Sequence, residues 1–421
     1  MPATKAVFIA ENDSGVVPPT SGPDYIETPI SSEGVRAASS ATQDDLITDS
    51  RQPRDVVRTG FECSGPLASR LAYGMHDHIL EGALFSADWS NVNGSGTKVA
   101  SATVQLLTAS KTIVATAATP FAGLAVGDWV RLEKVGYANH GIAVRISVWT
   151  DSSNIAYDSW TATPTNDGSA VSGVTVRPGQ RIVPGNTDRE FTYVKKIAQA
   201  GATLYECFIG AKFDGLSLQA QPGQIMAFGS QVFARRVVED FTGSFTIDDD
   251  GEIAATGNDI ELATYLASAG GGGYTAAPGN KLFSTAQRSG GAVMLDGVPS
   301  SIMSTFSMDL QNNIAGEPVL FRQGNAYVEP GQVGIAGNFE AIFADSTLYE
   351  KFIADQEARL GLYVVDNSLQ GYLFDWPSIR INDGGTQIQG QTGLVKLALS
   401  WGATVDVTTS RAMQVIRFGA D

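Results

Sequence analysis

The chain has 421 residues, a mass of 44.3 kDa and a formal net charge of −16. Such acidity argues against a protein that grips nucleic acid, because Lys and Arg supply phosphate binding, but a surface along which nucleic acid slides stays open. No stretch approaches the ~18 apolar residues of a membrane span, and the apolar patch at 6–10 is too short for a signal peptide. We therefore expect a protein made in a reducing cytoplasm, with Cys63 and Cys207 as free thiols.

Only 17% of the residues are charged, which is less than the ~25% of an ordinary soluble domain. Two interpretations fit this composition. The chain is either a β-rich protein with Ser, Thr, Gly and Asn on its outer faces, or a protein whose surface is largely covered by copies of itself. The 46 glycines and a mean hydropathy near zero favour the second.

Residues 1–56 predict an extended N-terminal arm. They are rich in Ser, Thr, Pro and acids and show no sustained period. Such an arm is either disordered or docked on a neighbour, and composition does not choose between the two. Residues 57–67 then alternate as a strand does, and Leu71, Met75, Ile79 and Leu80 follow at a spacing that predicts a helix of about three turns.

Residues 97–185 contain six short alternating segments separated by turn signals, which predict a small inserted β domain, a barrel or a sandwich. Residues 57–96 and 186–238 then form one fold of longer, half-buried antiparallel strands. Residues 239–299 carry an acidic run and the glycines 270–273, which predict a long loop. Residues 300–421 return to strands, with one helix at 346–360.

An internal repeat is predicted because the order strand, helix, hairpin, strand occurs twice. Residues 57–85 can be laid on 331–360, with Gly60 on Gly334, and residues 205–220 on 372–387. The alternative is that antiparallel β sequences simply resemble one another.

No catalytic, cofactor-binding or metal-binding residue is predicted, and the chain is not expected to be an enzyme. His76 and His78 would diverge by ~200° on a helix, so we place them on a solvated helix face at the rim of a subunit contact. His140 lies in a turn. The acidic segment 246–253 lacks both end ligands of an EF-hand loop, and glycines 270–273 lack the residues of a phosphate-binding loop.

Most of the chain outside 97–185 resembles the major tail tube proteins of bacteriophages with long, flexible, non-contractile tails. The segments that carry the resemblance are 27–67, 73–89, 191–197, 204–233, 303–313, 326–353 and 369–391. The resemblance implies a mainly β protein with a duplicated sandwich or barrel fold, short flanking helices and an added small β-barrel domain that the minimal tube fold lacks.

The function that the resemblance implies is structural. Subunits join edge to edge into rings, and rings stack through the arm and the long loop into a tube with an acidic lumen that conducts DNA during ejection. The implied partners are further copies of the chain, the tape-measure protein, double-stranded DNA, and the tail terminator and tail-tip proteins, in a virion tail assembled in the host cytoplasm. Two folds per chain predict three chains per ring as a pseudo-hexamer, with six chains as the alternative.

Two other functions remain open from the sequence. One is another virion β protein, such as a tail-tip or decoration protein. The other is a secreted carbohydrate-active enzyme, for which we see neither a signal peptide nor a clear pair of catalytic carboxylates.

Overall fold

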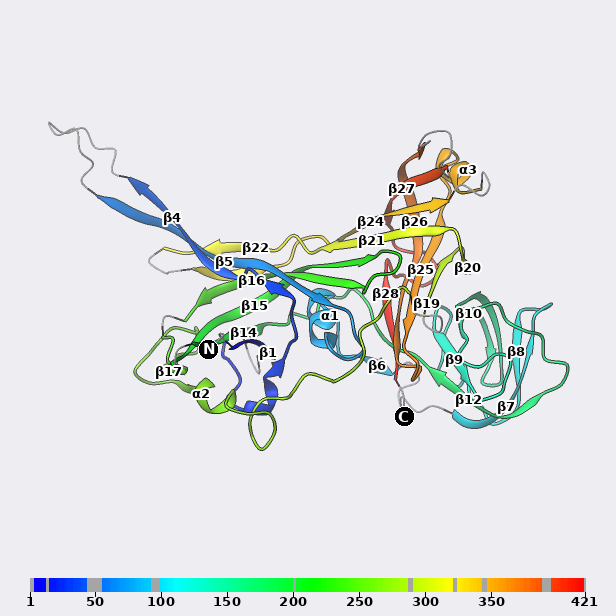
Figure 1. Ribbon diagram of the computed structural model, residues 1–421, viewed down its shortest axis with the longest axis horizontal. Helices are drawn as coiled ribbons and strands as arrows, with labels where there is room; N and C mark the ends of the chain where they lie inside the picture. Colours follow the sequence, from blue (N-terminus) through cyan, green and yellow to red (C-terminus); the bar gives the residue numbers. More distant parts are fainter. Residues whose placement is uncertain are drawn as a thin grey trace.

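A computed structural model describes residues 4–12, 15–43, 55–91, 99–199, 202–238, 240–286, 291–320, 324–342, 347–387 and 395–419. The protein is mainly β, with one extended sheet system, a separate closed barrel and few, short helices (Figure 1). Within the described ranges, no helix is both long enough and apolar enough to cross a membrane.

The first unit, fold 1, is an antiparallel sheet with the strand order β1–β14–β15–β16–β5–β4. Its elements are β1 (Thr4–Glu11), β2 (Ile26–Glu27), β3 (Ser32–Glu33), β4 (Arg36–Gln43), β5 (Val56–Arg70), α1 (Asp77–Ala83), β14 (Phe191–Gln199), β15 (Ala202–Ala220) and β16 (Ala227–Val237).

The second unit, fold 2, has the same strand order, β19–β25–β26–β27–β24–β21. Its elements are β19 (Gly291–Leu295), β20 (Val298–Ser300), β21 (Met303–Gln311), β24 (Gly334–Ile342), α3 (Thr347–Ile353), β25 (Ala358–Val365), β26 (Gly371–Gln387) and β27 (Lys396–Ala403). Each element of fold 2 occupies the chain position and the sheet position of its counterpart in fold 1.

Two irregularities of register fix the correspondence between the folds. β15 slips against β14 between Phe208 and Ala211, and again against β16 between Phe213 and Gly215. β26 slips at the same spacing, between Trp376 and Ile379 and between Ile381 and Asp383. Bulges bend and twist a strand locally, so both copies of the long central strand bend at the same two places.

The predicted alignment of the repeat was displaced by one or two residues. Gly65 lies opposite Val232, and Gly337 lies opposite the corresponding Trp401, so Gly60 matches Gln332 and not Gly334. Likewise the bulges match Tyr205 to Leu373 and not to Tyr372. Successive side chains of a strand point to opposite faces of the sheet, so an alternating pattern can be aligned equally well two residues away. A bulge also inserts one residue, and an alignment of the two sequences does not detect it.

The two folds join through β15 and β21, whose register runs from Gly215 opposite Gln311 to Ala220 opposite Phe306. Beyond this pairing, β22 (Ala315–Pro318) and β23 (Asn325–Glu329) extend β21 and β24 as a hairpin that lies along fold 1 (Figure 1). The remaining strands of the sheet system are β6 (Ser90–Asn91), β13 (Gln180–Ile182) and β28 (Gln414–Phe418), and β28 pairs with β26.

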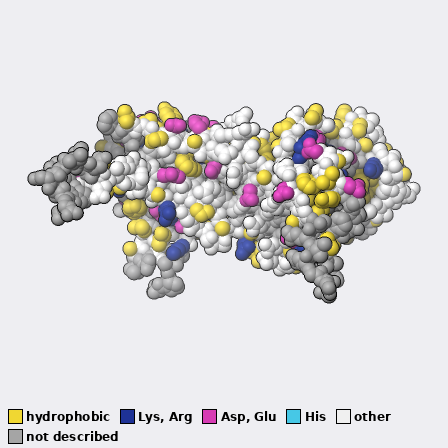
Figure 2. Space-filling view, turned by 90° about the horizontal axis from the view of Figure 1, so that it is seen from above, with side chains coloured by type: hydrophobic (Ala, Val, Ile, Leu, Met, Phe, Trp, Pro, Cys, Tyr) yellow, Lys and Arg dark blue, Asp and Glu magenta, His cyan; other side chains and the backbone are white. Residues whose placement is uncertain are grey.

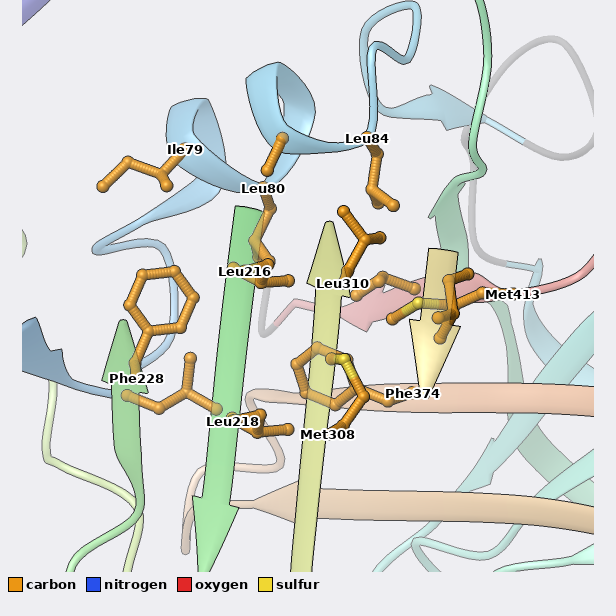
Figure 3. Packing of buried hydrophobic residues seen from close by; sticks show 14 of the residues in the cluster. Ile79, Leu80, Leu84, Leu216, Leu218, Phe228, Met308, Leu310, Phe374 and Met413 are labelled. Atoms are coloured by element: carbon orange, nitrogen blue, oxygen red, sulfur yellow. The ribbon is translucent and has the colours of Figure 1, made fainter. Parts of the chain in front are cut away.

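The largest hydrophobic core contains residues of both folds, and α1 covers one side of it. Leu80 of α1 and Leu84, which follows the helix, point toward Leu216 and Leu310 (Figure 3), and Ile79 belongs to the same buried cluster. The predicted three-turn helix is only Asp77–Ala83, because residues 73–76 form a turn. The second predicted helix ends at Ile353, and Ala358–Val365 is strand β25.

The closed six-stranded barrel lies within the predicted insertion 97–185. Its strands are β7 (Val99–Leu107), β8 (Thr112–Ala117), β9 (Trp129–Glu133), β10 (Ala143–Asp151), β11 (Asn154–Trp160) and β12 (Val171–Pro178). Its interior is a separate hydrophobic cluster that includes Val104, Leu132 and Val176.

The prediction of an extended arm over 1–56 was wrong for the ordered strands it contains. β1 pairs along its whole length with β14, and Val7, Phe8 and Ile9 are buried. Alternation over only eight residues inside a polar, Pro-rich segment gave too weak a signal to detect. Removal of residues 1–50 would therefore delete a core strand rather than a tail.

The prediction of a long loop over 239–299 was also wrong in part. Besides β19 and β20, the segment contains β17 (Ser244–Ile247), β18 (Asn258–Glu261) and α2 (Leu262–Tyr265). Phe245, Ile247 and Ile260 from this segment pack with Phe8 and Cys207 over the outer face of β1, β14 and β15. The segment thus covers part of fold 1, although its acid and glycine content suggests a loop.

Candidate assembly surface and lumen face

One side of the joined sheet points away from the core and is polar. The register gives a row of directly opposite residues across six strands, from Ala68 through Gly229, Ser217, Asp309 and Ala336 to Gly402. The next row, which includes Leu67, Leu216 and Leu310, points into the core. We call the outward side the polar sheet face.

The polar sheet face is built from small or uncharged side chains with scattered charges. Besides the row above, it presents Pro66, Gln219, Gln231, Ser307, Gln311, Asn338, Glu340, Asp383, Gly385, Ala398 and Ser400. Figure 2, seen from above, shows mainly uncharged side chains here, with acidic ones along the middle of the face and few basic ones between them. Such a surface offers phosphate few counter-charges.

Two shallow depressions lie on this face at corresponding places of the two folds. The one in fold 2 has a volume of about 770 Å³ and is bordered by residues such as Ser307, Asn338 and Ser400. The one in fold 1 has a volume of about 520 Å³ and is bordered by Ser217 and Gln231. Their walls are small polar side chains and backbone, with no cluster of titratable groups arranged for chemistry.

Matching ion clusters mark the two folds beside the second bulge. In fold 1, Lys212 pairs with Asp188 at 2.6 Å and with Glu190 at 3.7 Å. In fold 2, Arg380 pairs with Asp355 at 2.8 Å and with Glu357 at 3.3 Å. The register makes Arg380 the counterpart of Lys212, because each precedes the corresponding bulge at the same spacing.

The two clusters differ in exposure. The Lys212 side chain is 1% exposed, because the β22–β23 hairpin of fold 2 covers that side of fold 1. The Arg380 side chain is 40% exposed, and Asp355 and Glu357 are 74% and 59% exposed. Sequence reasoning missed both clusters, because the partners are separated by more than twenty residues.

The barrel docks on the outer face of β19, β25, β26 and β28 and is not merely tethered there. Trp129 of β9 is 1% exposed and packs with Met294, Tyr363, Leu373 and other apolar residues of fold 2. Its indole N–H donates to Asp375 Oδ2 at 3.0 Å, and Gln414 donates to the same oxygen at 2.7 Å. This interface corresponds to the one by which 240–275 covers fold 1.

Charge also joins the barrel to fold 2. Asp158 of β11 lies between Arg145, at 3.0 Å, and Arg359 of β25, at 2.9 Å. Burial alone would raise the pKa of Asp158, but the two guanidinium groups lower it below its usual value. The carboxylate is therefore held charged at the contact between the barrel and β25.

The histidines do not occupy the solvated helix face that we predicted. His76 is buried at the start of α1, lies 2.9 Å from Ser69 Oγ through Nε2, and packs on Phe228. Burial lowers the pKa of His76 to about 4 and that of the half-buried His78 to about 3. His140 accepts the backbone N–H of Lys134 at 2.9 Å, so it holds a turn of the barrel.

The two cysteines are free, as expected, and both are buried. Cys63 lies in the main core, whereas Cys207 lies under the segment 240–275. Burial raises the pKa of the Cys63 thiol to about 12, which keeps the thiol protonated.

The acidic segment forms a plain turn. In it Asp248 Oδ1 accepts the backbone N–H groups of Asp250 and Glu252 at 3.0 and 2.8 Å. Among the described residues, no three His, Cys, Asp or Glu side chains gather as metal ligands would.

Comparison with known proteins shows the family. A family model described as phage tail tube protein matches residues 3–408. A comparison with curated proteins gives no match. The matched range covers both folds and the barrel, and the family is structural and not enzymatic. The chain therefore belongs to the phage tail tube protein family, and it is a structural protein of the virion tail that self-assembles into a tube.

Proposed function

We propose that three chains close each ring of the tube, so that six similar folds surround the lumen. The observation that carries this proposal is that fold 1 and fold 2 have the same strand order and are already joined edge to edge through β15 and β21. If fold 2 of one chain joins fold 1 of the next chain in the same geometry, the sheet continues from chain to chain. Contacts within chains and contacts between chains then alternate, and they close into a ring when the rotation from one fold to the next divides a full turn evenly. Six chains per ring, each lining the lumen with one fold, is the alternative.

The polar sheet face lines the lumen in this proposal. Its small and uncharged side chains support this, since DNA and a tape-measure protein must pass without being held. Asp309 on this face repels phosphate at short range. The segment 240–275 and the barrel cover the outer faces of the two folds, which supports a position of the barrel on the outer wall of the tube.

The tail type and the remaining partners follow from the sequence resemblance. We propose a long, non-contractile tail that is assembled in the host cytoplasm, in which the tube conducts the genome during ejection. A tail terminator caps one end of this tube, and tail-tip proteins close the other end.

Electron microscopy of the purified protein tests the proposal. We expect tubes whose reconstruction has threefold symmetry, with both folds of each chain at the lumen and superposable on each other. Sixfold symmetry with one sandwich per chain at the lumen would contradict the ring of three. A lumen lined by net positive charge would contradict the assignment of the polar sheet face.

A further inference from the structure

The hairpin of fold 2 shows how one fold binds the next. We call residues 312–318 and 325–333, which carry β22 and β23, hairpin 2. Asn312 donates through Nδ2 to the carbonyl oxygens of Ala83 and Phe213, at 2.8 and 2.9 Å. The N–H of Ile314 donates to Asp214 Oδ1 at 2.7 Å.

Hairpin 2 also buries apolar surface on fold 1. Val328 is fully buried and packs with Ile314 and Phe85, and Phe233 of β16 packs against them. Strand pairing between β15 and β21 and this cap together hold fold 2 on fold 1.

Fold 2 has the corresponding surface, and no described strand or hairpin covers it. Among the described residues, β26 from 380 to 387 pairs only with β27, whereas the matching part of β15 lies between β16 and β21. The ion cluster of Arg380 is exposed where that of Lys212 is covered. Asn382 occupies the bulge position of Asp214, so its side chain carries an amide oxygen where that of Asp214 carries a carboxylate.

Fold 1 has the corresponding hairpin, and among the described residues no third strand pairs with it except β16 at Cys63. We call residues 36–43 and 56–63, from β4 and β5, hairpin 1. The register of its two strands slips by one residue between Ser40 and Ala41. The matching position in fold 2 is the junction between the β21–β24 pairing and the β22–β23 pairing. Val56, the counterpart of the buried Val328, is 61% exposed.

The chain's own fold 2 lies out of reach of hairpin 1. Hairpin 1 projects from one end of the molecule, whereas α3, β26 and β27 lie toward the other end (Figure 1). Only a second copy can bring the two surfaces together, and an exposed strand edge calls for such a partner.

We propose that hairpin 1 of one chain docks on β26 and β27 of the next chain, as hairpin 2 docks on fold 1 within the chain. The proposal rests on the tube function and specifies its ring contact. Transfer of the β15–β21 register places Arg36 opposite Gly385 and Ala38 opposite Asp383.

Charge and hydrogen bonding at this contact are complementary. Arg36 is then diagonal to Asp383 on the same face, within reach of a long side chain. Ala41, the counterpart of Ile314, presents its N–H to the amide oxygen of Asn382. Val56 is covered by the contact, and hairpin 1 belongs to the ring rather than to the stacking arm that we predicted.

Cysteine crosslinking in the full-length protein tests the register. The test variant carries Arg36→Cys with Gly385→Cys, since a Cβ at Gly385 meets no atom within 4 Å. The positive control carries Ser217→Cys with Asp309→Cys, which are directly opposite within one chain. The negative control carries Arg36→Cys with Ser400→Cys, which places the second thiol one strand further away on the same face, beyond disulfide reach.

After mild oxidation of assembled protein, we expect the test variant to give linked chains on a non-reducing gel, in a ladder that ends at three. The positive control should crosslink within single chains, and the negative control should give no linked chains. Tubes in which the positive control crosslinks and the test variant does not would overturn the docking register and leave the tube function standing. Linked rings that never stack into tubes would support the docking contact and contradict the tube.

A charge exchange gives a second readout that does not depend on thiol geometry. Arg36→Asp should raise the concentration needed for assembly roughly fivefold per contact, because it places like charges beside each other. Arg36→Asp with Asp383→Arg should restore assembly. Equal impairment in the single and double variants, both folded by circular dichroism, would overturn the proposed contact.

Discussion

At the residue scale, the buried polar groups of this protein hold the fold together and do not perform chemistry. His76 anchors the start of α1 on Ser69, and Asp375 joins the barrel to β28 through Trp129 and Gln414. Each of these groups is buried with its partners, so the loss of one partner leaves another polar group without a hydrogen bond.

The titration of His76 should make stability depend on pH. Burial lowers the pKa of His76 to about 4 in the folded protein. Between pH 6.5 and pH 4 the imidazole of His76 is therefore protonated in the unfolded chain and neutral in the folded chain. Stability is then fully present above pH 6.5 and falls as the pH drops toward 4. We expect the stability of the native chain relative to His76→Gln to decrease by about 2 kcal/mol between pH 8 and pH 5.

Denaturant unfolding of both proteins at several pH values measures this difference. The comparison cancels the titrations that both proteins share, including Glu81, whose pKa burial raises to about 7 and whose effect on stability has the opposite sign. Parallel stability profiles of the two proteins would show that His76 does not titrate as described.

Asp375 should be needed for docking of the barrel. Asp375→Ala leaves the buried indole N–H of Trp129 without its acceptor and leaves Gln414 Nε2 with only the carbonyl oxygen of Gly127, and we expect a loss of about 2–4 kcal/mol. Asp375→Asn keeps an acceptor oxygen and should lose less. Thermal unfolding with hydrogen exchange in β9 and β28 compares the two variants, and an equal loss in both would mean that the negative charge matters rather than the acceptor.

At the element scale, three different segments of the chain pack on the two copies of the repeated fold. The segment 240–275 covers the outer face of fold 1, the barrel covers the outer face of fold 2, and hairpin 2 packs on Phe85 and Phe233 of fold 1. The repeated strands are therefore constant, and the elements added between them close different surfaces.

The barrel should be dispensable for tube formation only if the surface beneath it is made polar. Replacement of residues 97–179 by a Gly/Ser linker would expose Met294, Tyr363 and Leu373, which are at most 4% exposed in the intact protein. We expect this deletion to aggregate, because an apolar patch of that kind is an aggregation site.

The same deletion combined with Met294→Gln and Tyr363→Lys should be soluble and should form tubes. Light scattering and electron microscopy separate the cases. A soluble, folded double variant that forms no tubes would show that the barrel takes part in the lattice itself.

At the scale of the whole molecule, the two sides of the joined sheet differ in a way that suits a conduit. The side away from the covers is small, polar and sparsely charged (Figure 2), and in the proposed ring it faces the lumen. In that ring, sparse charge on this side suits the lumen, and the outer faces of the folds are buried under segments of the same chain.

Reversal of charge on the polar sheet face should slow genome passage. Asp309→Lys puts a cation at an exposed position of this face, where it would bind phosphate in a salt-dependent manner. We expect normal tubes and slower DNA ejection from phage carrying the variant, with partial recovery at high salt. Asp249→Lys, in the exposed acidic turn over fold 1, is the matched control and should eject normally; equal slowing by both variants would contradict the lumen assignment.

The sequence by itself determined the features that depend on local pattern. Alternating hydrophobicity fixed the β class, turn signals bounded the small β domain near its observed strands, and the order of elements revealed the repeat. These features survive because strand periodicity and turn chemistry act over a few residues. The absence of a clear alternating pattern did not mean the absence of strands, since β1 and β17 lie in segments whose composition suggests an arm and a loop.

Only the tertiary structure decided register, covering and exposure. A bulge shifts every later residue to the other face, so the equivalence of Phe213 with Ile381 appears only in the strand pairing. Lys212 is buried because a hairpin from about a hundred residues later in the chain covers it. Arg380 is exposed in the single chain, and in our proposal a second chain covers it. His76 looked like a solvated residue for the same reason, because the strands that bury it come from distant parts of the chain.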